Sequence, residues 1–297
     1  MTCIGKQDRS LMLKTLCACT VLCIAGLCVG TFFDLQISQT LYQPANPFAI
    51  FFSIVGLLPL TIPACVFLGA LAQRQMVGEK PVALRVLLAI VCVALACVIA
   101  YVAVKGLPTI GGPEVSIELS GIALVIASLV LGLGCVAAGF VAARKNDEAE
   151  LVRRLLLAIV VLAVSYALVE LGKAIMHRPR YYTVVAGIEG VSFQPWYKPF
   201  SGYKELIESG VIGDAFKSFP SGHAAQAGSF LSGFYGLTAL FPSLRNKWRV
   251  GIVVGLVLVL AICVSRIVLG AHYLSDVSVG VLAPVLVAFV IPTRANT

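Results

Sequence analysis

Two of the three histidines in this 297-residue chain stand in settings that can support chemistry. His272 is followed four residues later by Asp276, and residues four apart share one face of a helix. A carboxylate there can keep one ring nitrogen protonated and leave the other free to act as a nucleophile. His223 closes the segment Pro-Ser-Gly-His and can donate a proton to a leaving oxygen. The two histidines therefore suit a nucleophilic group transfer.

Positive side chains accompany both histidines. Lys173 and Arg180 stand in one short segment, and Arg266 precedes His272 by six residues. Ser221 and Gly222 lie where a helix is expected to begin, and free N–H groups and the helix dipole favour an anion there. Lys173, Arg180 and Arg266, with Ser221 and Gly222, therefore describe a cradle for a phosphate group.

The elements that position these residues are expected to be membrane-spanning helices. Apolar residues make up 59% of the chain and charged residues 12%, against about 25% charged residues in soluble domains. A spanning helix needs about 20 apolar residues. Eight stretches qualify: Leu11–Phe33, Pro47–Leu71, Ala83–Val104, Leu119–Ala143, Leu155–Ile175, Ala224–Phe241, Val250–Val268 and Tyr273–Ile291. The sequence thus predicts an all-α, polytopic helix bundle with about eight transmembrane helices.

Charge and cysteine usage fit this class. The net charge of +8 is scattered over short loops without a basic run, which argues against nucleic acid as a partner. Nine of the ten cysteines lie inside apolar runs, and no pair has zinc-ligand spacing near a histidine. Small buried hydrophobic residues are the simpler interpretation of these cysteines.

The lysines and arginines of the loops predict the orientation. With the N-terminus in the cytoplasm, the inner segments hold fourteen basic residues and the outer segments eight, as the positive-inside rule requires. Both termini are then cytoplasmic. The end of the fifth span, the start of the sixth, the end of the seventh and the start of the eighth share the outer side. The three clusters can therefore meet there.

The connection between the fifth and sixth spans, residues 176–222, is unusually long. Loops of that length tend to be functional. Its seven aromatic residues favour an aromatic belt at headgroup level, and the alternative is a lid or rim that contacts a lipid substrate. They are Tyr181, Tyr182, Phe193, Trp196, Tyr197, Phe200 and Tyr203.

The three clusters together resemble the type 2 phosphatidic acid phosphatase (PAP2, or lipid phosphate phosphatase) superfamily. Its motifs are Lys-x6-Arg-Pro, Pro-Ser-Gly-His and Ser-Arg-x5-His-x3-Asp. The second and third are present in full, at residues 220–223 and 265–276. The first is present at Lys173 and Arg180, but Tyr181 stands in place of the proline. The motifs cover about a third of the chain, in order, each at a helix end.

The resemblance implies a role for each residue. His272 is expected to form a phosphohistidine, Asp276 to orient it, and His223 to act as the general acid. The phosphate ligands are expected to be Lys173, Arg180, Ser221, Gly222 and Arg266. No metal or other cofactor is expected, because side-chain cations already neutralise the phosphate oxygens and no carboxylate cluster is present to hold magnesium.

Three further residues have two interpretations each. Arg178 is either a fourth phosphate ligand or, the interpretation we favour, a residue that binds headgroups or solvent at the membrane surface. Glu170 is placed to form an ion pair with Lys173, three residues further on, and the pair is either structural or tunes the lysine. Ser265 is either a helix cap or a weak member of the site.

The expected function is hydrolysis of a lipid phosphate at the outer face of a cell membrane. Substrates of the classes of undecaprenyl diphosphate, phosphatidate and phosphatidylglycerol phosphate all fit. A phosphotransferase, in which another hydroxyl replaces water, would use the same residues. A transporter is disfavoured because the charges lie at helix ends rather than at mid-membrane. Residues 151–297 form the expected catalytic core, and residues 1–150 hold transmembrane helices of unassigned role. Family members commonly have three spans before the first motif, whereas five are counted here.

Overall fold

A computed structural model of the chain describes residues 6–77, 79–106, 120–146 and 150–291. Every regular element in these ranges is a helix, which confirms the expected all-α class. The long helices are α1 (Lys6–Leu41), α3 (Leu58–Met76), α4 (Val82–Lys105), α5 (Gly121–Arg144), α6 (Leu151–Met176) and α11 (Trp248–Val268). The shorter ones are α2 (Pro47–Val55), α7 (Tyr181–Val185), α8 (Tyr203–Glu208), η3 (Gly213–Phe216), α9 (Gly222–Gly228), α10 (Phe230–Leu240), η4 (Pro242–Lys247) and α12 (Leu274–Ala288).

Six segments of the described residues are long and apolar enough to cross a membrane. They are Gln7–Leu41, Pro47–Met76, Val82–Lys105, Gly121–Arg144, Leu151–Val185 and Pro242–Val268. They match six of the eight expected stretches, and the first residue of the fourth, Leu119, lies outside the described residues. The sixth expected span is divided at Ser229 into α9 and α10, and the helix of the eighth, α12, has only 15 residues. These two fall short of the roughly 20 residues that a spanning helix needs, so the count of eight is not confirmed.

Small residues allow the helices to approach closely, as is common in membrane proteins. On α1, a Cβ at Gly26 or Gly30 would collide with Ser278 or Ser275 of α12. On α5, a Cβ at Gly139 would collide with the backbone of Val66 on α3. The glycines therefore bring α1 against α12 and α5 against α3.

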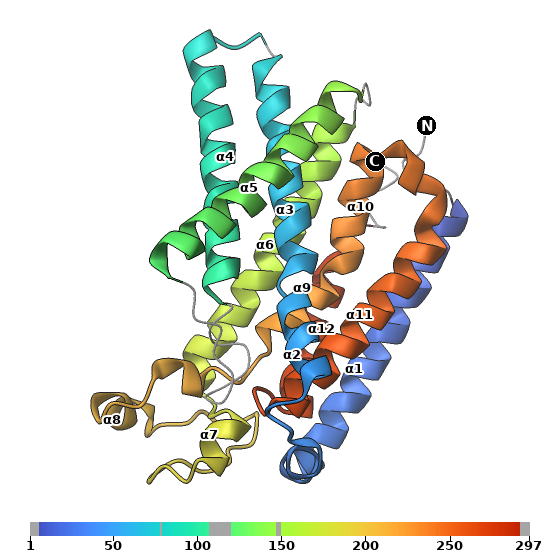
Figure 1. Cartoon of the computed structure of the whole chain (residues 1–297). Coiled ribbons are helices and arrows are strands. Elements are labelled where there is room, and N and C mark those ends of the chain that lie inside the picture. Colours follow the sequence, from blue (N-terminus) through green and yellow to red (C-terminus); the bar gives the residue numbers. More distant parts are fainter. Residues whose placement is uncertain (1–5, 78, 107–119, 147–149, 292–297) are drawn as a thin grey trace.

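The helices divide into a core and an added hairpin. In the core, α12 packs against α1, α6 and α9, while α11 packs against α2 and α9. α4 and α5 pack against each other and against α3, with little other packing. The connection that carries α7 and α8 gathers at the end of the bundle opposite the beginning of α1 (Figure 1). That end also holds the three motif clusters.

Candidate active site

A cavity of about 620 Å³ lies where the three motif clusters meet. Lys173 at the end of α6 and Arg180 just after it line one side. Gly222 and His223 at the start of α9 line a second side, and His272 reaches the cavity from the connection between α11 and α12. The structure therefore brings together residues that the sequence places up to about a hundred positions apart.

Two of the cations on the cavity wall, Lys173 and Arg180, each have an acidic neighbour. Lys173 Nζ lies 2.7 Å from Glu170 Oε1, which confirms the ion pair expected from their spacing. Arg180 lies 3.0 Å from Asp214 Oδ2 and donates from Nε to the Asp214 carbonyl oxygen. The Arg180 guanidinium lowers the pKa of the Asp214 carboxyl and keeps it ionised. Asp214 belongs to η3 in the long connection, and no sequence motif pointed to it.

Gly222 has a specific geometric reason to be glycine. A Cβ at this position would lie 3.1 Å from Lys173 Nζ. The absence of a side chain therefore lets the ammonium group come close to the start of α9, where the first backbone N–H groups of the helix lack partners within it. The lysine and the helix N-terminus can then contact the same anion.

Three of the remaining motif residues lie behind the cavity wall rather than on it. Ser221 is fully buried and caps α9, its Oγ accepting a hydrogen bond from the Ala224 N–H. Arg266 is also buried and donates to the hydroxyl of Ser53 on α2. Ser265 donates to the Ile262 carbonyl within its own helix, at 2.7 Å. Arg266 acts on the cavity through its charge, while Ser221 and Ser265 shape the backbone around it.

His272 is held by a backbone carbonyl. Its Nδ1 atom lies 2.5 Å from the carbonyl oxygen of Ser218, so this nitrogen carries the proton and donates it, and Nε2 keeps its lone pair. Burial lowers the pKa of His272 well below its usual value, and the charges of Arg180 and Arg266 lower it further. The ring is therefore neutral, which a nucleophilic nitrogen requires.

Asp276 acts on His272 through an intermediate residue. Its Oδ2 lies 4.0 Å from His272 Nδ1, which is too far for a hydrogen bond. The same oxygen accepts from the Ser218 hydroxyl at 2.5 Å and from the Tyr273 N–H at 2.8 Å. Asp276 thus fixes Ser218 and the start of α12, and Ser218 orients the imidazole. Sequence reasoning missed Ser218, which precedes the Pro-Ser-Gly-His motif and carries no signal of its own.

Arg178 does not lie at the membrane surface, contrary to the interpretation that its position in the sequence favoured. It is fully buried and pairs with Asp276 Oδ1 at 2.5 Å and with Asp34 Oδ2 at 2.9 Å. Tyr273 stacks on its guanidinium, 4.1 Å from ring centroid to Cζ. The physical reason is Asp34, a buried carboxylate on α1 that requires a cation. Arg180, not Arg178, therefore lines the cavity.

His223 and Gln226 present unsatisfied polar atoms to the cavity. Both residues line it, and neither His223 Nε2 nor Gln226 Oε1 has a hydrogen-bond partner among the described residues. Burial lowers the pKa of His223, and the charges of Arg266, Arg180 and Lys173 lower it further. Unpaired buried polar atoms are costly, so their position favours a ligand. Sequence reasoning overlooked Gln226, although a polar residue three positions after His223 shares its helix face.

The aromatic residues of the long connection mostly pack against protein. Tyr181 and Phe200 are buried, and Trp196 donates from Nε1 to Thr31 of α1 at 2.9 Å. Phe193 contacts the Tyr273 ring edge-on at 5.3 Å between centroids. Of the seven aromatic residues, Tyr197 alone is strongly exposed, at 61%. The connection is therefore a folded cover over this end of the bundle rather than a belt of exposed rings.

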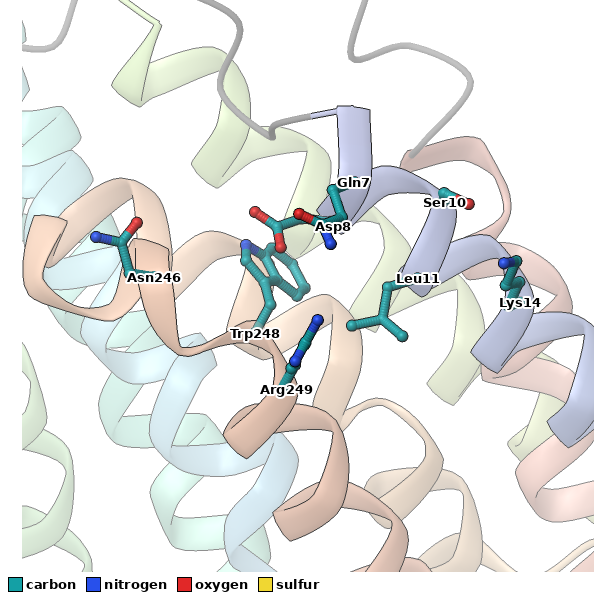
Figure 2. Close-up of a pocket in the computed structure, with 8 residues that line it drawn as sticks. All are labelled: Gln7, Asp8, Ser10, Leu11, Lys14, Asn246, Trp248 and Arg249. Carbon is teal, nitrogen blue, oxygen red and sulfur yellow. The ribbon is translucent and has the colours of Figure 1, made fainter.

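A second hollow, of about 750 Å³, lies at the other end of α1 and α11. Gln7, Asp8, Lys14, Trp248 and Arg249 are among its lining residues (Figure 2). None of the motif residues reaches it. Its lining holds two cations, Lys14 and Arg249, and no histidine. The cavity at the motif clusters, which holds His223, His272 and several cations, is therefore the candidate site.

Comparison with known families supports this choice. Residues 154–297 match the model of the PAP2 superfamily, and this segment of the chain belongs to that superfamily. The match begins in α6 and includes all three motif clusters. No significant match to a curated protein or to a solved structure is found. Membership indicates, in general terms, a phosphatase of lipid phosphates in a multi-pass membrane protein. α1 to α5 lie outside the matched segment.

Proposed function

We propose that this protein hydrolyses a lipid phosphate or diphosphate through a covalent phosphohistidine on His272. One observation carries the proposal: His272, with Nδ1 committed to Ser218, shares a cavity with Lys173, Arg180 and the unpartnered His223 Nε2. A nucleophile, an acid and an anion-binding surface are the parts that phosphoryl transfer needs.

In the first step, His272 Nε2 attacks phosphorus and the bond between phosphorus and the leaving oxygen breaks. The electrons of that bond go to the oxygen, which takes a proton from His223. Lys173, Arg180 and the N–H groups at the start of α9 stabilise the equatorial oxygens, and Arg266 adds its charge from behind. The negative phosphate offsets the three cations that depress the pKa of His223, so that His223 becomes protonated when substrate binds.

In the second step, water attacks the phosphohistidine and the phosphorus–nitrogen bond breaks. His223, now neutral, accepts the proton of the water, and inorganic phosphate leaves. Ser218 and Asp276 are positioning residues in both steps: they hold the imidazole in one tautomer and one orientation. Undecaprenyl diphosphate, phosphatidate and phosphatidylglycerol phosphate remain the substrate classes, and the outer face remains the proposed location.

The mechanism requires no metal ion, because side chains supply the positive charge and would repel a divalent cation. The test is phosphate release by the purified protein from a panel of lipid phosphates in detergent with excess chelator. Activity should persist in chelator and disappear in His272→Ala. Loss of wild-type activity on chelation would overturn the metal-free mechanism. Full activity in His272→Ala would remove the nucleophile assignment.

A further inference from the structure

The candidate cavity is amphipathic along its length. Charged lining residues, among them Lys105, Lys173 and Arg180, gather at the end that holds the two histidines. Away from that end the lining is apolar, formed by α3, α4 and α6 with residues such as Ile99 and Ala163. A polar head and a hydrocarbon chain in one ligand match this division, since each part then meets its own kind of surface.

The apolar part is deep. On α6 the lining extends from Lys173 down to Ile159, fourteen residues further into the bundle. At 1.5 Å per residue this is about 21 Å of helix, or more than half of the roughly 30 Å hydrocarbon thickness of a bilayer. A headgroup alone leaves most of this length empty.

The added α4–α5 hairpin supplies one wall of this apolar part. Val98, Ile99 and Ala103 on α4 line the cavity opposite α6. α4 packs closely against α3 and α5 and only marginally against α6. The contact with α5 is tight, because a Cβ at Gly132 on α5 would lie 3.3 Å from Ala100 on α4. Val98 is 57% exposed. The cavity therefore has a lateral side between α4 and α6 that faces the lipid phase.

We propose that α4 and α6 form the binding site for the hydrocarbon chain of the substrate, which enters between them from the bilayer while the phosphate reaches His272. The proposal rests on the proposed function and extends it: it assigns to a hairpin outside the family-matched segment the selection of substrates by chain. The occupant is the chain of the lipid phosphate itself, because one continuous cavity joins the apolar wall to the cationic end.

The test compares two phosphatidates that share a headgroup, one with long acyl chains and one with short chains that is water-soluble. Ile99→Trp on α4 and Ala163→Trp on α6 fill the apolar part. The ratio of kcat/KM for the long-chain to the short-chain substrate should fall about tenfold or more, the scale of steric discrimination in an apolar pocket. Ala94→Trp is the matched control, because Ala94 is an exposed α4 residue outside the cavity lining. The control should keep the wild-type ratio.

An unchanged ratio in both lining variants, or the same fall in the control, overturns the proposal. A second measurement does not depend on turnover. A long-chain lipid phosphate with a photoreactive group at mid-chain, bound to His272→Ala, should cross-link to α4 and α6 residues. Unlabelled lipid phosphate should suppress this cross-linking, and an excess of an uncharged lipid should not. Cross-linking confined to helices other than α3, α4 and α6, which line the cavity, or equal competition by the uncharged lipid, counts against the site.

The two proposals can fail separately. If the wild-type protein releases phosphate from no member of the lipid phosphate panel, the proposed function fails, and the cross-linking result still decides whether the chain binds between α4 and α6. If both phosphatidates are cleaved and the long-chain to short-chain ratio of kcat/KM is unchanged in both lining variants, the phosphatase assignment stands and the proposed chain site is wrong.

Discussion

The Nδ1 atom of His272 lies 2.5 Å from the backbone carbonyl oxygen of Ser218. The bond fixes the tautomer of the proposed nucleophile, a task that sequence spacing had suggested for Asp276. Asp276 holds the Ser218 hydroxyl instead. Orientation of the imidazole therefore depends on a chain of two hydrogen bonds that joins the connection before α9 to the start of α12.

Ser218→Ala tests this chain, because it removes the hydroxyl and keeps the carbonyl. We expect kcat to fall about tenfold to a hundredfold, the scale of a small misplacement of a reacting group, with KM for a short-chain phosphatidate nearly unchanged. Ser218→Thr, which restores the hydroxyl, should recover most of the loss. If Ser218→Ala retains wild-type kcat, or if Thr and Ala behave alike, Ser218 does not position His272.

The pH dependence of kcat/KM reports ionisation in the free enzyme. Because the pKa of His272 is lowered, the imidazole stays neutral as pH falls through about 6.5, the usual value for histidine. In the wild-type protein, the fall in kcat/KM at acidic pH that reports protonation of His272 should therefore lie below that pH. Arg180→Gln removes one of the charges that depress this pKa, so the acidic fall in kcat/KM of this variant should move to higher pH. The substrate's own titration is the same for both proteins. If the acidic fall in kcat/KM of Arg180→Gln stays at the wild-type pH or moves to lower pH, it does not report His272.

The general-acid role of His223 predicts a dependence on the leaving group. His223→Asn should slow release of an alcohol from a lipid phosphate by about a hundredfold or more, the usual size of general acid catalysis. Release of p-nitrophenol, a much better leaving group, should fall far less. Equal losses with both substrates would show that His223 binds phosphate instead of donating a proton. His272→Asn is the reference, because it should abolish turnover of both.

The buried ion pairs around Arg178 predict a stability effect that originates on α1. Asp34 pairs with Arg178 and also accepts from the Ser275 backbone N–H at 2.9 Å. Asp34→Asn leaves part of a buried positive charge uncompensated, and we expect a loss of about 3 kcal/mol in the free energy of unfolding. Thermal or denaturant unfolding in detergent measures it. Asp8→Asn, at the partly exposed beginning of the same helix, should change little, and equal effects of the two variants would count against a structural role for Asp34.

The meeting of the three clusters could be predicted because it depends on local spacing and on the alternation of helix directions. Lys173, His223 and His272 each stand at a helix end, and an even number of crossings brings those ends to one side. Which of the two arginines, Arg178 or Arg180, lines the cavity could not be predicted in the same way. It depends on Asp34, 144 residues away from Arg178, and on the left-handed backbone of His177, whose φ is 44° and which ends α6.

Some helix boundaries could likewise be predicted from the sequence and others could not. Hydropathy identified the six long apolar segments, since their length and composition suffice. It did not reveal the division at Ser229 between α9 and α10 or the early end of α12, because apolar residues continue through both places. Ser218 and Gln226 were missed for a related reason: their partners or neighbours in space come from distant segments, and their residue types alone carry no signal.

Trapping of the phosphoenzyme tests the central claim most directly. A lipid phosphate labelled in the phosphoryl group should transfer its label to the protein within one turnover, and the linkage should be labile in acid and stable in base, as a phosphoramidate is. Mass spectrometry should place the phosphoryl group on His272, and His272→Ala should take up no label. A label on another residue, or hydrolysis by His272→Ala at the wild-type rate, would contradict the account.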